Sequence, residues 1–178
     1  MEVILVRHTS VGVPRGTCYG WTDVPLADTF EEEAAATKAN LQQYAPFDSV
    51  FSSPLTRARR LAEFCTPPTT AIQFDERLKE MNMGQWEMKI YDEIDDPYFD
   101  QWMNDYMHLP TPGGEGFPGQ YQRVSQFLDE LKTLPYNRVA VFAHGGVLVC
   151  AGLYGGLFQA DTAWSQLVPY GGLERIVI

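Results

Sequence analysis

Short apolar runs alternate with stretches of helical periodicity along this chain. Runs of β-branched and aromatic residues predict strands at residues 2–6, 48–51, 71–74, 138–143 and 173–178. Apolar residues recur every three or four positions in other stretches, which predicts helices at residues 30–44, 54–65, 121–134 and 146–157. This alternation predicts an α/β fold, a three-layer α/β/α sandwich around a mostly parallel sheet.

Two of the predicted helices begin with capping signals. Thr29 followed by Glu32 fits a capping box. Ser53 offers a helix cap and Pro54 the favoured first helical position. We therefore expect the second helix to begin at Pro54 and to run to about Cys65.

The middle of the chain, residues 76–119, interrupts the alternation. This segment is rich in aromatic residues, methionine and acidic groups, and it contains Pro110, Pro112 and the pair Gly113-Gly114. We expect a single domain, residues 1–178, with this segment as an irregular excursion over one end of the sheet. Open α/β sheets bind their ligands at such an end.

The charge of the chain restricts its partners. The 178 residues can bury a core without disulfides, and 13 basic against 23 acidic residues give a net charge of −10. A chain this acidic lacks the basic surface that nucleic acids and anionic membranes require. If the substrate is an anion, its site must be a local concentration of positive charge.

Cysteine spacing and hydropathy indicate a cytoplasmic protein. The three cysteines, Cys18, Cys65 and Cys150, are far apart and form no metal-binding motif, so we expect reduced thiols and no metal. The first residues lack the basic lead and long apolar run of a signal peptide. Residues 139–158 could span a bilayer by length, but their five glycines favour a buried strand, a turn and a core helix.

Two histidines follow predicted buried strands. Arg7-His8 follows the first strand, and His144-Gly145-Gly146 follows the strand at 138–143. The carboxyl ends of strands in an α/β sheet open onto the ligand crevice. A single histidine in such a place is more often a satisfied core residue, but two at the same topological position raise the weight of a catalytic role.

A third strand end carries arginines. In the helix that follows Ser52-Ser53, Arg60 points away from the apolar face, and Arg57 and Arg59 flank it on opposite sides. Periodicity does not choose between these two, but Arg57 lies in the first turn, where free N–H groups favour an anion. Guanidinium groups bind phosphoryl groups, and a neutral imidazole can attack phosphorus.

A proton donor for the leaving oxygen must come from elsewhere. The middle segment and the residue just before it contain several carboxylates that could donate this proton: Asp75, Glu76, Glu80 and Glu87. Residue type alone does not choose among them. Glu80 precedes a stretch whose Gly84 permits a tight return over the site, whereas Glu87 could fix the loop instead.

Four motifs in order along the chain resemble those of the histidine phosphatase superfamily, the phosphoglycerate-mutase-like enzymes. They are Val6-Arg7-His8-Thr9, Ser53-Pro54-Leu55-Thr56-Arg57-Ala58, Leu78-Lys79-Glu80-Met81 with the residues to Glu87, and Ala143-His144-Gly145-Gly146. By this resemblance His8 is the nucleophile that becomes phosphorylated, and Glu80 is first the acid and then the base. The resemblance further implies that Arg7, Arg57 and His144 hold the phosphoryl oxygens, and that neither cofactor nor metal is required.

Two further segments narrow the resemblance to the alpha-ribazole phosphatase branch. They are residues 18–26, which contain Tyr19, and Pro112-Gly113-Gly114-Glu115. The resemblance adds Tyr19 and Glu115 as substrate-binding candidates. The chain departs from the family pattern at Thr9, Ser10, Leu61 and Gly116.

These observations favour a metal-independent phosphomonoesterase that acts on a small phosphorylated substrate, with alpha-ribazole 5'-phosphate, an intermediate in cobalamin lower-ligand assembly, as the expected one. The alternatives are a broad-specificity small-molecule phosphatase, a phosphoglycerate mutase and a non-catalytic phospholigand-binding module. For the remaining groups we expect a solvated His108 and an Arg123 in a structural ion pair. We expect the four tryptophans, Trp21, Trp86, Trp102 and Trp164, to be core or packing residues rather than to stack on a substrate base. The sequence leaves the oligomeric state, including a homodimer, open.

Overall fold

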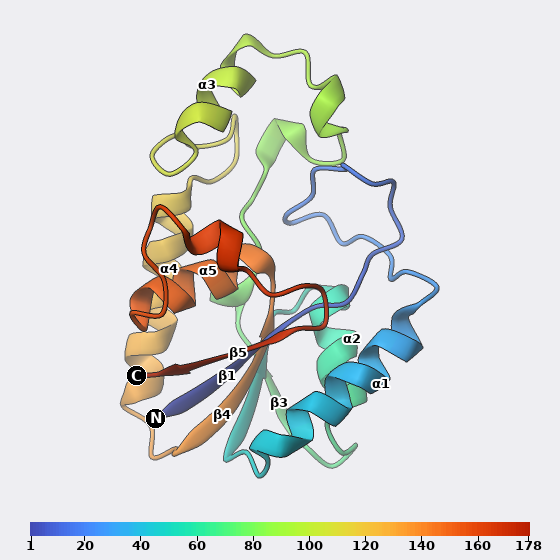
Figure 1. Ribbon diagram of the computed structural model, residues 1–178, viewed down its shortest axis with the longest axis vertical. Coiled ribbons are helices and arrows are strands. Elements are labelled where there is room, and N and C mark those ends of the chain that lie inside the picture. The colour runs from blue at the N-terminus through green and yellow to red at the C-terminus, as the bar shows by residue number, and fades with distance from the viewer.

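A five-stranded sheet forms the centre of the molecule, and the computed structural model describes all residues, 1–178. The strands are β1 (Glu2–Arg7), β2 (Ser49–Ser52), β3 (Ile72–Phe74), β4 (Arg138–Ala143) and β5 (Leu173–Val177). Their order is β3-β2-β4-β1-β5, with every neighbouring pair parallel except β1 and β5 (Figure 1). The prediction of a mostly parallel sheet is confirmed.

Helices cover both faces of the sheet. Helices α1 (Phe30–Leu41) and α2 (Thr56–Cys65) pack on one face, and α4 (Phe117–Lys132) and α5 (Gly145–Tyr154) pack on the other (Figure 1). Because side chains alternate along a strand, Ile4 of β1 joins the first core and Leu5 the second. The three-layer α/β/α arrangement is therefore as the sequence predicts.

The segment that interrupts the alternation, residues 76–119, forms a cap at the end of the sheet where β1 and β4 finish (Figure 1). It consists of short 3₁₀ turns and one helix, α3 (Pro97–Asp105), which the sequence pattern does not predict. The cap has a separate apolar cluster of buried residues: Cys18, Met81, Met83, Trp86 and Trp102. It therefore has an apolar core of its own beside the two cores of the sandwich.

The stretch 139–158 divides into two elements. Residues 138–143 form β4, and helix α5 that follows has ten residues. None of the helices is long and apolar enough to cross a membrane.

One helix start and one predicted cap differ from expectation. Helix α2 begins at Thr56 rather than at Pro54, because Asp23 from a distant loop binds both the main-chain N–H (2.9 Å) and the hydroxyl of Thr56 (2.6 Å). Thr29 forms no capping box. Its hydroxyl donates to Glu33 (2.6 Å), and the same carboxylate accepts the Ser10 N–H (2.8 Å). Both carboxylates fix loops that lead to the site.

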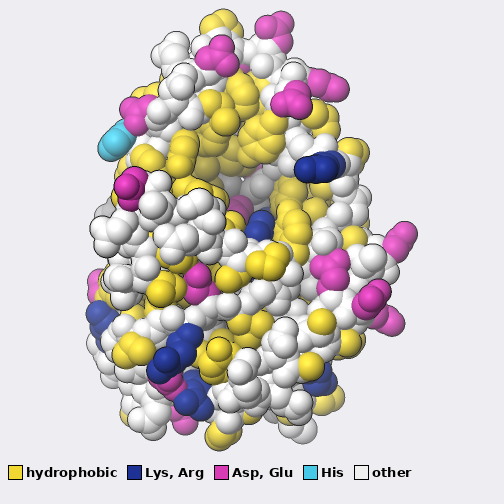
Figure 2. Space-filling view, viewed as in Figure 1, with side chains coloured by type: hydrophobic (Ala, Val, Ile, Leu, Met, Phe, Trp, Pro, Cys, Tyr) yellow, Lys and Arg dark blue, Asp and Glu magenta, His cyan; other side chains and the backbone are white.

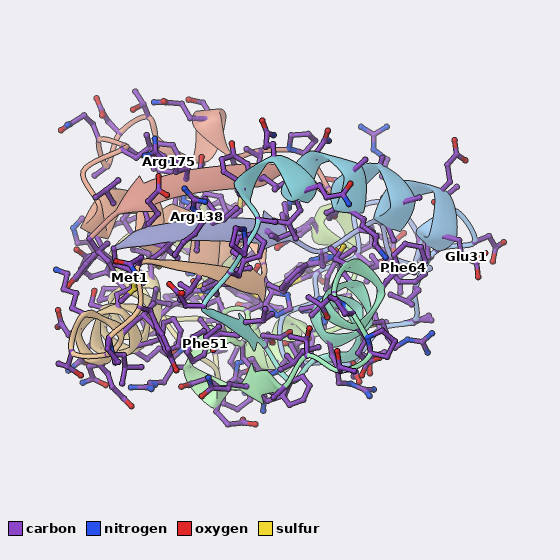
Figure 3. The ribbon with its side chains drawn as sticks, turned by 90° about the horizontal axis from the view of Figure 1, so that it is seen from below. Met1, Glu31, Phe51, Phe64, Arg138 and Arg175 are labelled. Carbon is purple, nitrogen blue, oxygen red and sulfur yellow. The ribbon has the colours of Figure 1, made fainter.

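The opposite end of the sheet is held by one carboxylate. Arg138 on β4 and Arg175 on β5 flank Glu2 of β1, and their Nε atoms lie 2.6 and 2.7 Å from its oxygens (Figure 3). These two arginines hold the pKa of Glu2 below its usual value. The register of three neighbouring strands is thereby fixed at their shared end.

Candidate active site

The carboxyl ends of three adjacent strands bring the predicted site residues together. In the order β2-β4-β1, Ser53, His144 and His8 each follow the last residue of a strand. The rings of His8 and His144 lie with their centroids 5.2 Å apart, and both residues are buried. The structure thus places side by side two histidines that are 136 positions apart in sequence.

His8 is oriented and neutral. Its Nδ1 lies 2.7 Å from the carbonyl oxygen of Thr9. Because a carbonyl only accepts, Nδ1 carries the hydrogen and Nε2 keeps its lone pair. Burial, reinforced by the charges of Arg57 and Arg7, lowers the pKa of His8 to about 3. A neutral imidazole with a free Nε2 lone pair is a nucleophile at neutral pH.

The two arginines are anchored by main-chain carbonyls. Arg57 is fully buried and donates to the carbonyls of Gly20 (2.6 Å) and Thr22 (3.1 Å). Arg7 donates from Nη1 to the carbonyl of Val168 (2.7 Å). The Nε of each arginine is buried without a partner. Buried donors without partners are costly, so each Nε is available to an anionic ligand.

Arg59, the other arginine that periodicity left open, lies at the surface. It is half-buried and faces Glu63 one helical turn away at 3.4 Å. The Thr56 N–H in the first turn of α2 binds Asp23 and is not free for a ligand, contrary to expectation. On α2, a ligand therefore cannot use the Thr56 amide, but it can use the unpartnered Nε of Arg57.

His144 presents one free ring nitrogen. Its Nε2 lies 2.8 Å from the hydroxyl of Ser53, and its Nδ1 is buried without a partner. Burial, with Arg57 and His8 nearby, lowers the pKa of His144 well below its usual value. If the Ser53 hydroxyl donates to Nε2, Nδ1 carries a hydrogen that a ligand oxygen can accept.

Glu80 is held by three donors. Its Oε1 accepts from the Met81 N–H (2.9 Å) and from Nε2 of Gln120 (2.8 Å), and its Oε2 accepts from the Gly146 N–H (3.1 Å). Gly146 lies in the first turn of α5, where the helix favours a negative charge. The carboxylate is thereby held beside the strand end that carries His144.

The structure separates Glu80 from the other carboxylates that the sequence offered. Asp75 pairs with Arg77 (2.6 Å), and Glu76 is exposed beside Lys79. Glu87 accepts from the main-chain N–H groups of a loop, with Trp21 at 2.8 Å and Gly20 at 3.0 Å. Burial raises the pKa of Glu87, but these hydrogen bonds outweigh it and hold the pKa below its usual value. Glu87 therefore fixes the loop.

Glu115, a predicted substrate-binding residue, forms an ion pair outside the cavity that Glu80 lines. It pairs with Arg123 (2.8 Å), whose guanidinium also donates to the carbonyls of Lys79 (2.6 Å) and Glu80 (3.0 Å). Arg123 is thus in the structural ion pair that the sequence suggested. The pair fixes the main chain at Glu80, and Glu115 does not line the cavity beside it.

Two tyrosines lie over the strand ends. The hydroxyls of Tyr19 and Tyr170 are 3.0 Å apart, and the ring centroid of Tyr170 is 5.4 Å from that of His8. Arg7 stacks on Tyr170 (4.3 Å) and Arg57 on Tyr19 (5.1 Å). The sequence prediction includes Tyr19 but misses Tyr170, which lies in a loop without a motif. The tyrosines keep the guanidinium planes in fixed orientations.

A cavity of about 520 Å³ opens beside Glu80 under the cap. Ten of its twelve lining residues are hydrophobic, the other two are acidic, and none is basic. The lining residues are Tyr19, Glu80, Met81, Met83, Tyr91, Asp92, Phe99, Trp102, Met103, Tyr106, Phe117 and Trp164. Figure 2 shows the hollow in the upper half of the molecule, with hydrophobic walls and charged side chains at its floor.

The four tryptophans and His108 lie in three places: the cavity wall, the interior of the cap and the surface. Trp102 and Trp164 line the cavity, whereas Trp86 is buried in the cap. Trp21 is exposed and packs under Lys79. His108 is exposed beside Asp105. Of the four tryptophans, Trp86 and Trp102 are buried, whereas Trp21 and Trp164 lie outside the core.

Comparison with known proteins gives one family and several activities. The model of the Histidine phosphatase superfamily (branch 1) matches residues 3–176. The Adenosylcobalamin/alpha-ribazole phosphatase of Salmonella typhimurium is 31% identical over 155 residues, 83% of this chain and 76% of the relative. Phosphoserine phosphatase 1 of Hydrogenobacter thermophilus is 27% identical over 172 residues, 93% of this chain and 81% of that protein.

A crystal structure gives the same family. The alpha-ribazole phosphatase from Shigella flexneri has a TM-score of 0.90 and 28% identity to this chain. The match covers 100% of this chain and 91% of that one. Since relatives with different substrates are similar to this chain at nearly equal identity, the substrate must be argued from the cavity.

Gly146→Ala tests the position of the Glu80 carboxylate. A Cβ at this position would lie 2.4 Å from Oε1 of Glu80 and 2.7 Å from both terminal atoms of Gln120. We expect kcat/KM for an alkyl phosphate to fall about 10²-fold, because a small misplacement of a reacting group costs that much. Gly119→Ala is the control, since its Cβ meets nothing closer than 3.4 Å. Wild-type rates in Gly146→Ala would show that the carboxylate position does not matter.

Proposed function

The chain belongs to the histidine phosphatase superfamily, and from this membership we propose that it hydrolyses phosphate monoesters through a phosphohistidine on His8. The observation that carries the proposal is a neutral His8 with a free Nε2 beside buried, unpartnered nitrogens of Arg7, Arg57 and His144. These donors match a phosphoryl group, whose transition state spreads negative charge over its oxygens.

In the first step Nε2 of His8 attacks phosphorus and the bond from phosphorus to the ester oxygen breaks. Glu80 gives its proton to the departing oxygen, and the alcohol leaves. The imidazole becomes positively charged as the bond from nitrogen to phosphorus forms, and the Thr9 carbonyl stabilises it through the hydrogen on Nδ1. Arg7 and Arg57 hold the phosphoryl oxygens throughout.

In the second step a water molecule attacks phosphorus and the bond to Nε2 breaks. Glu80, now a carboxylate, takes a proton from the water and becomes an acid again. Phosphate leaves, and the enzyme returns to its starting state. The steps balance without a metal ion: the guanidinium groups supply the positive charge for the phosphoryl oxygens, and neutral His144 supplies a hydrogen-bond donor.

The cavity favours a leaving group that is apolar and carries no negative charge. Serine and glycerate each carry a carboxylate, which needs a cationic partner, and no Lys or Arg lines the cavity. Asp92, the acidic lining residue that the proposed reaction does not require in the neutral form, would instead repel it. An aromatic leaving group can pack between the rings of Tyr91, Phe99 and Trp102.

We propose alpha-ribazole 5'-phosphate as the substrate, because its alcohol is a nucleoside with an aromatic benzimidazole base. The names of the Salmonella and Shigella relatives support this choice. The same cavity argues against phosphoserine and against a phosphoglycerate mutase. A broad-specificity phosphatase for aromatic alcohols is the alternative that the cavity also accommodates.

His8→Ala should abolish turnover, because the other imidazole, His144, has its Nε2 bound to Ser53 and in the proposed arrangement carries a hydrogen on Nδ1, which leaves it no lone pair for attack. In the wild type, rapid quench without acid after addition of ³²P-labelled substrate should trap an acid-labile phosphoprotein. Arg60→Ala, at an exposed position on the same helix, is the control and should retain activity. A label on serine, or no label under burst conditions, contradicts the mechanism. No turnover of any phosphomonoester by the wild type would favour a phospholigand-binding module.

Glu80→Gln and Glu87→Gln form a matched pair. General acid help is typically worth about 10²- to 10⁴-fold, and p-nitrophenolate leaves with little need of a proton. Glu80→Gln should therefore cost far more on an alkyl phosphate than on p-nitrophenyl phosphate, and its phosphoenzyme should persist. Glu87→Gln, which loosens the loop, should lower both rates alike. The reverse pattern would assign the acid role to Glu87.

A substrate panel tests the cavity argument. We expect kcat/KM for alpha-ribazole 5'-phosphate to exceed that for phosphoserine and 3-phosphoglycerate by about 10²-fold or more, since an unpaired carboxylate is strongly rejected. Trp164→Ala should lower the rate on alpha-ribazole 5'-phosphate and leave that on methyl phosphate nearly unchanged. Equal rates on diverse aromatic phosphates would indicate broad specificity, and a preference for phosphoserine would contradict the assignment.

A further inference from the structure

Gln120 is a polar residue at a core position. On α4 the buried residues are Phe117, Gln120, Val124, Phe127, Leu128 and Leu131, which form one helical face. Gln120 is fully buried, and a buried amide is costly unless it is hydrogen-bonded. Its Nε2 donates to Oε1 of Glu80 (2.8 Å), whereas its own Oε1 has no partner. A side chain that only packed would be better apolar here.

The partners of Glu80 differ in what they can do. The N–H groups of Met81 and Gly146 are main-chain donors and cannot accept. They satisfy a carboxylate but not the hydroxyl of a neutral carboxyl group. Gln120 is the one partner of this carboxylate with both a donor and an acceptor on the same side chain.

The proposed reaction requires both protonation states of Glu80, since the group is first an acid and then a base. Half a turn about the last side-chain bond of Gln120 exchanges its oxygen and nitrogen, which are similar in size. Both terminal atoms lie equally far, 2.7 Å, from the Cβ position at Gly146. The absence of a side chain at Gly146 therefore leaves room for the amide in either orientation.

We infer that Gln120 is a positioning residue that follows the protonation state of Glu80. It donates from Nε2 to the carboxylate and, after the half turn, accepts at Oε1 from the carboxyl hydroxyl. The proton thus has an acceptor before the ester oxygen arrives. The inference rests on the proposed role of Glu80 and adds to it the residue that keeps the carboxyl group in place in both states.

The role of Gln120 predicts the direction in which the pH profile moves when its side chain is changed. Loss of the Nε2 donor destabilises the carboxylate, so Glu80 keeps its proton to higher pH. The alkaline limb of the kcat/KM profile, which reports the acid form, should then move upward. A hydrogen bond to a charged group is worth roughly ten-fold in proton affinity, which corresponds to about one pH unit.

The experiment compares Gln120→Met and Gln120→Glu with the wild type. Methionine keeps the length and removes donor and acceptor, so the alkaline limb should rise by about one pH unit. Glutamate adds a like charge, which disfavours ionisation further, so the limb should rise more. The cost of Gln120→Met should be larger on an alkyl phosphate than on p-nitrophenyl phosphate. Gln122→Met, exposed on the same helix, should behave as the wild type.

Limbs that stay in place while both substrates slow equally would overturn the inference and leave Gln120 a packing residue. Thermal melting separates this outcome from unfolding, and if Gln120→Met does not fold, Gln120→Leu, which also removes both the donor and the acceptor, takes its place. The proposed function is tested apart from this, because a wild type without phosphohistidine or turnover would defeat it before any Gln120 variant is measured.

Discussion

The site depends on burying positive charge without a protein carboxylate bound to it. The guanidinium of Arg57 is fully buried, and a buried charge is stable only when its donors are satisfied. Two nitrogens of Arg57 donate hydrogen bonds to the carbonyls of Gly20 and Thr22. One nitrogen of Arg7 donates to the carbonyl of Val168. Carbonyls neutralise no charge, so the arginines keep their full attraction for an anion. The loops that hold these carbonyls are therefore as important to the site as the strands.

The same constraint explains why two glutamates near the site have different roles. Glu87 is held by a ring of main-chain N–H groups in the loop that carries Gly20, so it fixes the carbonyl that anchors Arg57. Glu80 has fewer donors and adjoins the cavity. Arg123 binds the main-chain carbonyl of Glu80 and leaves its carboxylate free of any ion pair. The surroundings of these two identical side chains thus give Glu87 a role in holding the loop and leave Glu80 available for the proposed proton transfer.

The fold could be predicted from sequence because strand and helix patterns are local. The strand at 138–143 was predicted at its observed bounds, and the histidines were found because each follows a buried strand. The first helix begins at Phe30 as predicted, but its capping box is absent because the Thr29 hydroxyl binds Glu33. The predicted start at Pro54 is wrong, and the first N–H of that helix binds the distant Asp23. Those partners cannot be read from a window of a few residues.

The site was only partly predictable for the same reason. Four carboxylates between residues 75 and 87 have equal chemistry, and only their tertiary partners distinguish them. Gln120 lies one position before the predicted apolar stripe of its helix, so the pattern does not mark it as a site residue. Tyr170 lies in a loop that has no periodicity. Contacts across long sequence separations, such as that between Tyr19 and Tyr170, have no local signature at all.

The charge of the chain bears on selectivity rather than on affinity. Residues 90–122 contain no Lys or Arg, and their acidic groups include Asp92, Glu93, Asp95 and Asp96. Exposed charges act over about 8 Å at physiological ionic strength, so the cap opposes an anion only when it is close. A phosphoryl group overcomes this repulsion because the buried guanidiniums lie in a low dielectric, where attraction is stronger. A carboxylate on the alcohol has no such partner, so under the proposed function the cap favours monoesters whose alcohol is uncharged.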